Sequence, residues 1–226
     1  MKKIAIIPAR GGSKRIPRKN IKLFLGKPII SYAIDAAIIS HEYDEVMVST
    51  DDKEIAEYAL SLGASVPFLR SSENSDDFAT TIDVILEVLH FYESKGTFFD
   101  VGTCIYPTAP FCTKELLTES INILKKEDLD SVFPIVRYGY PIQRALNFDE
   151  KGLIKMIDKS NTLKRSQDFT TSYHDAGQFY TFSIEKIKQL KTLMTNNSGA
   201  IEISELKVQD IDSEVDWKLA EIKYEL

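Results

Sequence analysis

The chain has 226 residues, 43% of them hydrophobic, and a net charge of −6 at pH 7. This length and apolar content suit one domain with a sizeable core. The acidic balance argues against a nucleic-acid or acidic-membrane surface and favours a small anionic ligand in one basic pocket. Cys104 and Cys112 lack metal-ligand spacing, and the first apolar stretch stops at Arg10, too short for a signal peptide or membrane span. A cytoplasmic protein with reduced thiols is expected.

Short apolar runs predict strands at residues 3–8, 45–49, 101–106, 131–136, 178–183 and 206–211. Between them, apolar residues with helical spacing predict helices over residues 29–37, 55–62, 82–89 and 116–124. Pro28 precedes the first helix, and Gly63 follows the second as a C-terminal cap. Alternation of this kind predicts a three-layer α/β/α fold with a mostly parallel, Rossmann-like sheet.

Regular patterning fails between residues 137 and 175, where aromatic and polar residues replace it. Residues 147–152 suggest a hairpin, whereas residues 196–199 suggest only a turn. The chain is therefore expected to form a single domain over residues 1–226, with residues 137–175 as an insertion on its body.

A glycine-rich loop follows the first predicted strand. Gly11 and Gly12 are adjacent, and five cations lie between Arg10 and Lys19. Backbone N–H groups beside glycine can approach an anion closely, and lysine and arginine supply the opposite charge. The spacing matches neither a Walker A loop nor a dinucleotide fingerprint. The loop therefore indicates a phosphate site at the carboxyl end of a strand, with a solvated surface loop as the alternative.

Two acidic pairs follow predicted strands. Asp51 and Asp52 come directly after residues 45–49, and helix capping explains one of them without a function, so Asp51 is the one expected to face the site.

Asp210 and Asp212 share one face if residues 206–211 form a strand, so both could bind one divalent cation. Capping of a helix that starts near Glu214 is the alternative. Asp128 and Asp130 have the same spacing, which shows how weak the pattern is alone.

Polar residues gather where the insertion returns to the body. Arg165 and Gln167 precede a stretch that contains Tyr173, His174 and Gln178. A cation, amides and a hydroxyl can bind a polar, acidic sugar, although a histidine beside an aspartate is more often an oriented structural pair.

Together these motifs resemble the cytidylyltransferases that activate nine-carbon acidic sugars, the CMP-sialic acid synthetase family. The resemblance spans essentially the whole chain, and it rests on motifs at residues 7–14, 17–20, 49–52, 70–81, 107–110 and 210–212. Within the family, residues 106–111 and 173–180 are most similar to the members that act on pseudaminic acid. The resemblance implies the fold of nucleotide-diphospho-sugar transferases.

The resemblance also implies roles for individual residues. Arg10, Lys19 and Asp212 would be catalytic, and Asp210 and Asp212 would hold Mg²⁺. The CTP-binding residues would be Ala9, Gly11, Gly12, Ser13, Lys14, Asn20, Arg70, Ala79 and Thr81. The sugar would be contacted by Tyr106, Arg165, Gln167, Tyr173, His174 and Gln178, with Arg165 paired to its carboxylate. Lys14 would assist with the phosphates, whereas Arg15 and Arg18 would be solvated neighbours.

The implied reaction joins CTP and the sugar into a CMP-sugar with release of pyrophosphate, in a pathway for bacterial surface or flagellar glycans. Sialate enzymes have glutamine where this chain has Tyr106, and a phenol lacks the amide's paired donor and acceptor. This difference favours another nonulosonic acid. Sialic, legionaminic or 3-deoxy-octulosonic acid remains an alternative, as does a non-catalytic nucleotide sensor. Residues 137–175 resemble the family's dimerisation arm, so a homodimer is expected, with no nucleic-acid or membrane partner.

Overall fold

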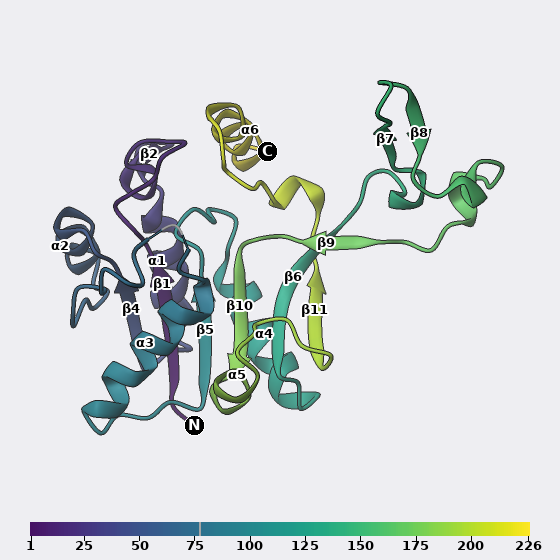
Figure 1. Cartoon of the computed structure of the whole chain (residues 1–226). Helices are drawn as coiled ribbons and strands as arrows, with labels where there is room; N and C mark the ends of the chain where they lie inside the picture. The colour runs from purple at the N-terminus through teal and green to yellow at the C-terminus, as the bar shows by residue number, and fades with distance from the viewer. Residues whose placement is uncertain (77) are drawn as a thin grey trace.

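The computed structural model describes residues 1–76 and 78–226. At its centre is a seven-stranded sheet (Figure 1). Six strands follow one another across it in the order β11 (Ser198–Glu202), β6 (Ser131–Arg137), β10 (Phe179–Ser183), β5 (Val101–Ile105), β1 (Lys3–Pro8) and β4 (Glu45–Ser49). The seventh, β9 (Tyr173–Asp175), pairs with β6.

The sheet is mixed, so the prediction of a mostly parallel sheet was only partly right. β1 pairs in parallel with β4 and β5, and β11 pairs in parallel with β6. β10 is antiparallel to both β5 and β6, and β9 is antiparallel to β6. The physical reason lies in the connection. The chain leaves the carboxyl end of β6, returns to the same edge without a crossover helix, and must therefore run back down the sheet.

Helices cover both faces of the sheet. On one face, α1 (Ile30–Ser40), α2 (Lys53–Ser61) and α4 (Lys114–Lys126) pack over Ala5 and Ile7 of β1. On the other, α3 (Thr81–Ser94) and α5 (Ile184–Leu190) pack over Ile4 and Ile6. Alternate residues of one strand therefore enter two separate cores, which explains why β1 is apolar throughout rather than alternating. In the described part of the chain, no helix is long and apolar enough to cross a membrane.

The remaining elements are short, apart from α6 (Glu214–Tyr224), whose Trp217 packs with Phe24 of β2 (Leu23–Phe24) in a third core. β2 pairs with β3 (Lys27–Pro28), and the described residues also form five single 3₁₀ turns: η1 (Lys19–Ile21), η2 (Ile142–Arg144), η3 (Lys159–Asn161), η4 (Ser166–Asp168) and η5 (Glu205–Lys207).

Most predicted elements are present, with two exceptions. The predicted strand at residues 206–211 was wrong, because this stretch continues from η5 without pairing to the sheet. The predicted turn at residues 196–199 was only partly right, because Asn196 and Asn197 form a turn but β11 begins at Ser198 and pairs with β6.

The stretch between β6 and β9, residues 138–172, projects from the body as an arm (Figure 1). It contains the hairpin of β7 (Leu146–Phe148) and β8 (Ile154–Met156), which forms its own two-stranded sheet. The predicted hairpin over residues 147–152 is therefore present, and Gly152 in its turn has a φ of 74°, a conformation that favours glycine.

Candidate active site

The glycine-rich loop lines a cavity of about 450 Å³ at the carboxyl end of β1. Among the predicted residues, Arg10, Ser13, Lys14, Lys19 and Asn20 line this cavity. The walls also include Pro8, Arg15, Tyr106, Pro107 and Thr108. The loop after β5 thus faces the loop after β1 across the cavity, because the two strands are parallel neighbours and end at the same edge. Four cations on one wall give a site suited to a polyanion.

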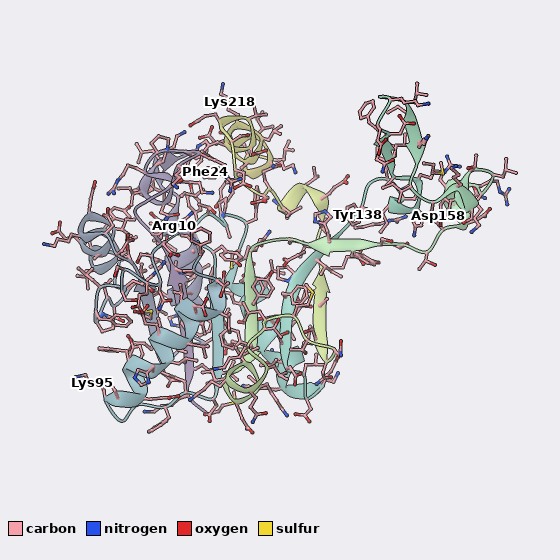
Figure 2. All side chains as sticks on the ribbon, in the orientation of Figure 1. Arg10, Phe24, Lys95, Tyr138, Asp158 and Lys218 are labelled. Carbon is pink, nitrogen blue, oxygen red and sulfur yellow. The ribbon has the colours of Figure 1, made fainter. Side chains whose placement is uncertain are left out.

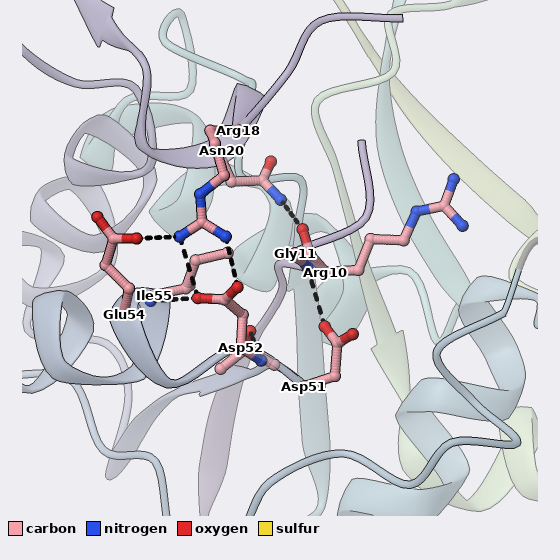
Figure 3. Close-up of polar contacts among 9 residues, drawn as sticks. Arg10, Gly11, Arg18, Asn20, Asp51, Asp52, Glu54 and Ile55 are labelled. Carbon is pink, nitrogen blue, oxygen red and sulfur yellow. Dashed lines mark hydrogen bonds and ion pairs between the residues drawn. The ribbon is translucent and has the colours of Figure 1, made fainter. Parts of the chain in front are cut away.

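Gly11 fixes the loop against the start of α2 (Figure 3). Its N–H donates to Asp51 Oδ1 at 2.9 Å. Asp52 caps α2 and accepts a bidentate pair from Arg18, which also reaches Glu54. The hydrogen bond from Arg18 lowers the pKa of Asp52. The capping role considered for this acidic pair therefore belongs to Asp52, and Arg18 is a structural anchor rather than a solvated neighbour.

The two adjacent glycines have different surroundings, which gives a testable difference. A Cβ on Gly11 would lie 2.6 Å from Asp52 Oδ2, whereas a Cβ on Gly12 would meet nothing within 4 Å. We expect Gly11→Ala to lower the free energy of unfolding by about 1–3 kcal/mol, since a forced contact must displace the capped helix end. Gly12→Ala should leave it within about 0.5 kcal/mol. Urea denaturation of both variants measures this, and equal stabilities would contradict the packing role of Gly11.

Lys19 and Asn20 follow the glycine-rich loop and lie in the short turn η1. Asn20 is buried, and its amide donates to the Arg10 carbonyl at 2.9 Å, so it holds the loop's backbone. Lys19 Nζ donates to the Ile211 carbonyl at 2.6 Å and lies 3.7 Å from Asp212 Oδ1. Burial lowers the pKa of Lys19, and the charge of Asp212 opposes that shift. Lys19 thus joins the glycine-rich loop to the segment that contains the predicted metal ligands.

That segment, residues 207–212, is held by side chains instead of a sheet ladder. Gln178 Nε2 donates to the Lys207 carbonyl at 2.6 Å, and Lys223 Nζ donates to the Val208 carbonyl at 2.8 Å. Gln178 is buried, and its backbone carbonyl accepts from the Tyr106 N–H at 2.9 Å. Gln178 therefore links the cavity wall to this segment, and its buried side-chain Oε1 has no hydrogen-bond partner among the described residues.

Asp210 and Asp212 are not needed to cap α6. Ser213 is its N-cap, and Ser213 and Asp216 complete a capping box, so the alternative explanation of the two aspartates fails. Asp212 Oδ2 also lies 2.7 Å from Arg15 Nη1, so two cations surround its carboxylate. Arg15, expected to be solvated, is a site residue that sequence reasoning missed, because residues 15 and 212 meet only through the fold.

A second cavity of about 590 Å³ adjoins the first, and Tyr106 and Thr108 line both. His174, Asp175, Tyr180 and Asp210 are among its other residues. Asp175 accepts a hydrogen bond from the Tyr180 hydroxyl. Burial raises the pKa of Tyr106 to about 12, so its phenol stays protonated at neutral pH and can donate a hydrogen bond. The predicted sugar contacts Tyr106 and His174 thus line the same cavity, and Asp175 and Tyr180 line it as well.

Other predicted CTP contacts lie beside the first cavity without lining it. Arg70 is buried and donates to the side chain and carbonyl of Ser49, and burial lowers its pKa. Thr81 begins α3, and its hydroxyl lies 3.3 Å from that of Tyr106. Ala79 donates its N–H to Asp76 Oδ1 at 2.7 Å, and the buried Ala9 belongs to the core. None of these four residues is among those that line the two cavities.

Three predicted sugar contacts are not brought into either cavity. Arg165 and Gln167 lie in the arm, where Arg165 Nε is 3.1 Å from Asp168 Oδ2. Tyr173 is at the base of the arm and pairs with Arg137 across β9 and β6. Figure 2 shows the separation, with Arg10 in the body and Asp158 far out on the arm.

The described residues thus form an α/β fold with a cationic cavity and a second cavity that meet at Tyr106 and Thr108. The sequence profile described as Cytidylyltransferase matches residues 4–213, and the chain belongs to this family. It is 40% identical to the pseudaminic acid cytidylyltransferase of Campylobacter jejuni over 100% of this chain and 97% of that protein. It is 32% identical to the CMP-N,N'-diacetyllegionaminic acid synthase of Legionella pneumophila over the same shares.

A solved structure of CMP:2-keto-3-deoxy-manno-octonic acid synthetase complexed with CTP superimposes with a TM-score of 0.72. The match covers 100% of both chains at 16% sequence identity. At this identity the likeness supports the fold alone. The mixed, partly parallel sheet is therefore shared with an enzyme whose sequence has diverged widely.

Proposed function

We propose that this cytidylyltransferase converts CTP and pseudaminic acid into CMP-pseudaminic acid and pyrophosphate. One observation favours it most: a cationic cavity and a second cavity with acid, imidazole and phenol groups meet at Tyr106 and Thr108. A triphosphate fits the first, and a polyhydroxylated sugar fits the second. The sugar's identity follows from the Campylobacter jejuni relative, which matches over the whole chain.

The chemistry is displacement at phosphorus. The anomeric oxygen of the sugar forms a bond to the α-phosphate, and the bond between the α-phosphate and the departing pyrophosphate breaks. Phosphoryl chemistry of this kind needs positioning and charge stabilisation rather than a covalent intermediate. Lys19 and Arg10, which line the cationic cavity, would neutralise charge on the triphosphate. The protonated phenol of Tyr106, which lines both cavities, would orient the sugar.

Asp210 and Asp212 would hold a magnesium ion together with the phosphates of the nucleotide, although the strand expected to align the two carboxylates is absent. The described residues contain no cluster of three acidic, histidine or cysteine side chains that could enclose a metal alone. Mg²⁺ commonly binds one or two carboxylates together with substrate phosphates, and Asp212 already attracts two protein cations. Bound there, the ion would supply charge neutralisation at the phosphates.

A substrate panel tests the proposal. Purified protein is incubated with CTP, Mg²⁺ and one of four sugars, and pyrophosphate release is measured. Pseudaminic acid should give at least tenfold higher kcat/KM than legionaminic, sialic or 3-deoxy-octulosonic acid. Preference for another sugar would overturn the proposed substrate, and CTP binding without turnover on any sugar would favour a nucleotide sensor.

We also propose that the protein acts in the cytoplasm, because the reaction consumes CTP and because both cysteines are free and buried.

We further propose that the chain is one domain with a dimerisation arm. The arm exposes large apolar side chains, among them Tyr140 (88% exposed), Phe148 (72%) and Leu163 (95%). Such a surface on a projecting hairpin favours burial against another subunit. In a homodimer the arm could bring Arg165 and Gln167 to the partner's sugar cavity, which would explain why neither reaches a cavity of its own chain.

Charge on the arm should therefore break the dimer. We expect the double variant Phe148→Glu and Leu163→Glu to sediment as a monomer, because two carboxylates cannot be buried unpaired in an apolar contact. Phe98→Glu is the matched control, since Phe98 is 65% exposed on the body and should leave the dimer intact. Sedimentation velocity measures both. A monomeric wild-type protein would overturn the assembly.

A further inference from the structure

Arg15 and Lys19 contact opposite oxygens of the Asp212 carboxylate. Arg15 Nη1 lies 2.7 Å from Oδ2, and Lys19 Nζ lies 3.7 Å from Oδ1. Both cations come from the glycine-rich loop and the turn that follows it, whereas Asp212 comes from the far end of the chain. In this state, protein cations occupy the directions from which a divalent ion would approach Asp212.

The two cations differ in how firmly they are held. The Lys19 side chain is 19% exposed, and its Nζ also donates to the Ile211 carbonyl at 2.6 Å. The Arg15 side chain is 70% exposed at its contact with Asp212. Exposed ion pairs contribute little net stability, because solvent screens the charges and ordering two side chains costs entropy. Arg15 can therefore leave Asp212 easily, whereas Lys19 is anchored.

Arg15 also lines the cationic cavity, beside Arg10, Ser13 and Lys14. A divalent ion on Asp212 would repel the guanidinium from its present place, since like charges a few ångströms apart interact unfavourably. The nearest favourable position is toward the triphosphate in the same cavity, because a planar guanidinium binds phosphate oxygens in a bidentate manner. The movement needs only a change of side-chain torsions.

We propose that Arg15 neutralises Asp212 before substrate binds and transfers to the triphosphate when the metal and nucleotide arrive. Resting on the proposed function, this makes Arg15 a phosphate-contacting residue that also competes with the metal for Asp212. The ligand-free protein then discriminates against metal without nucleotide, and the nucleotide and metal bind cooperatively.

The test uses two measurements on which Arg15→Ala has opposite effects. Mn²⁺ binding to nucleotide-free protein is measured by water-proton relaxation, and CTP binding in Mg²⁺ is measured by calorimetry. The variant should bind Mn²⁺ about two- to fivefold more tightly, since an exposed competing ion pair is removed. It should bind CTP at least threefold more weakly. Lys218→Ala is the control for lost charge, because Lys218 is exposed on α6, and it should leave both affinities unchanged.

A double-mutant cycle with Asp212→Asn identifies the contact. In that background Arg15→Ala should no longer change Mn²⁺ affinity, because the competition needs the carboxylate. Unchanged or weaker Mn²⁺ binding by Arg15→Ala would overturn the proposal, as would unchanged CTP affinity or the absence of Mn²⁺ binding by both proteins. Wild-type turnover with CTP and sugar is assayed alongside. If turnover is intact while these effects are absent, only the role of Arg15 fails, whereas no turnover rejects the proposed function itself.

Discussion

Lys19→Ala should lower kcat/KM by about 10²- to 10³-fold, the range seen when a preorganised charge-stabilising donor is removed from a site. Lys19 is held by the Ile211 carbonyl and Asp212, so its charge is fixed in the cationic cavity before CTP binds. A fixed charge needs no reorganisation when negative charge moves onto the departing pyrophosphate. Pyrophosphate release at saturating and limiting CTP measures the loss.

Two further variants separate catalysis from stability. Lys19→Met keeps much of the buried stem and should lose as much activity as Lys19→Ala with a smaller loss of thermal stability. Lys22→Ala removes a nearby lysine that pairs with Glu214 outside the cavity, and it should retain activity within about threefold. Wild-type turnover by Lys19→Ala would contradict the catalytic role of Lys19. Equal losses of activity in Lys19→Ala and Lys22→Ala would contradict it as well.

Much of the body of the fold could be predicted because its strands are short and buried on both faces. β1 and β4 are apolar runs whose ends match the predicted residues. β11 was missed because its Ser-Gly-Ala start has no apolar pattern, and it becomes a strand by pairing with β6. A strand was predicted at residues 206–211 for the converse reason. The stretch begins in the turn η5, and its carbonyls accept hydrogen bonds from the side chains of Gln178, Lys223 and Lys19 instead of from a neighbouring strand.

The site could be predicted where the loop itself contains the chemistry, and not where distant segments decide it. The glycines and cations of the loop lie close together in the sequence, so a cationic pocket after β1 could be predicted. Arg15 pairs with Asp212 and Arg18 pairs with Asp52, and neither pair could be predicted because its members are far apart in the sequence. Gln178 was expected at the sugar, and the structure adds a contact that the sequence did not predict, the hydrogen bond from its buried amide to the Lys207 carbonyl. Arg165 lines neither cavity of its own chain, and only the proposed homodimer would bring it to a sugar.

Asp212→Asn should reduce turnover by about 10²- to 10³-fold and weaken the dependence of CTP binding on Mg²⁺. An amide keeps the shape of the carboxylate but loses the charge that attracts a divalent ion. It also leaves Arg15 and Lys19 facing each other without the anion between them. CTP affinity with and without Mg²⁺, measured by calorimetry, should therefore differ much less in the variant than in the wild type.

The chain offers a matched control in Asp128→Asn. Asp128 and Asp130 have the same spacing as Asp210 and Asp212, but they lie beyond the end of α4, where Asp130 is hydrogen-bonded to Thr195. Asp128 has a φ of 50°, a left-handed conformation that asparagine adopts readily, so the change should not strain the backbone. Full activity in Asp128→Asn with loss in Asp212→Asn would show that position in the fold, and not the spacing of two aspartates, makes the metal site. If the Asp212→Asn enzyme were active with unchanged Mg²⁺ dependence, the metal would have to bind to residues other than Asp212.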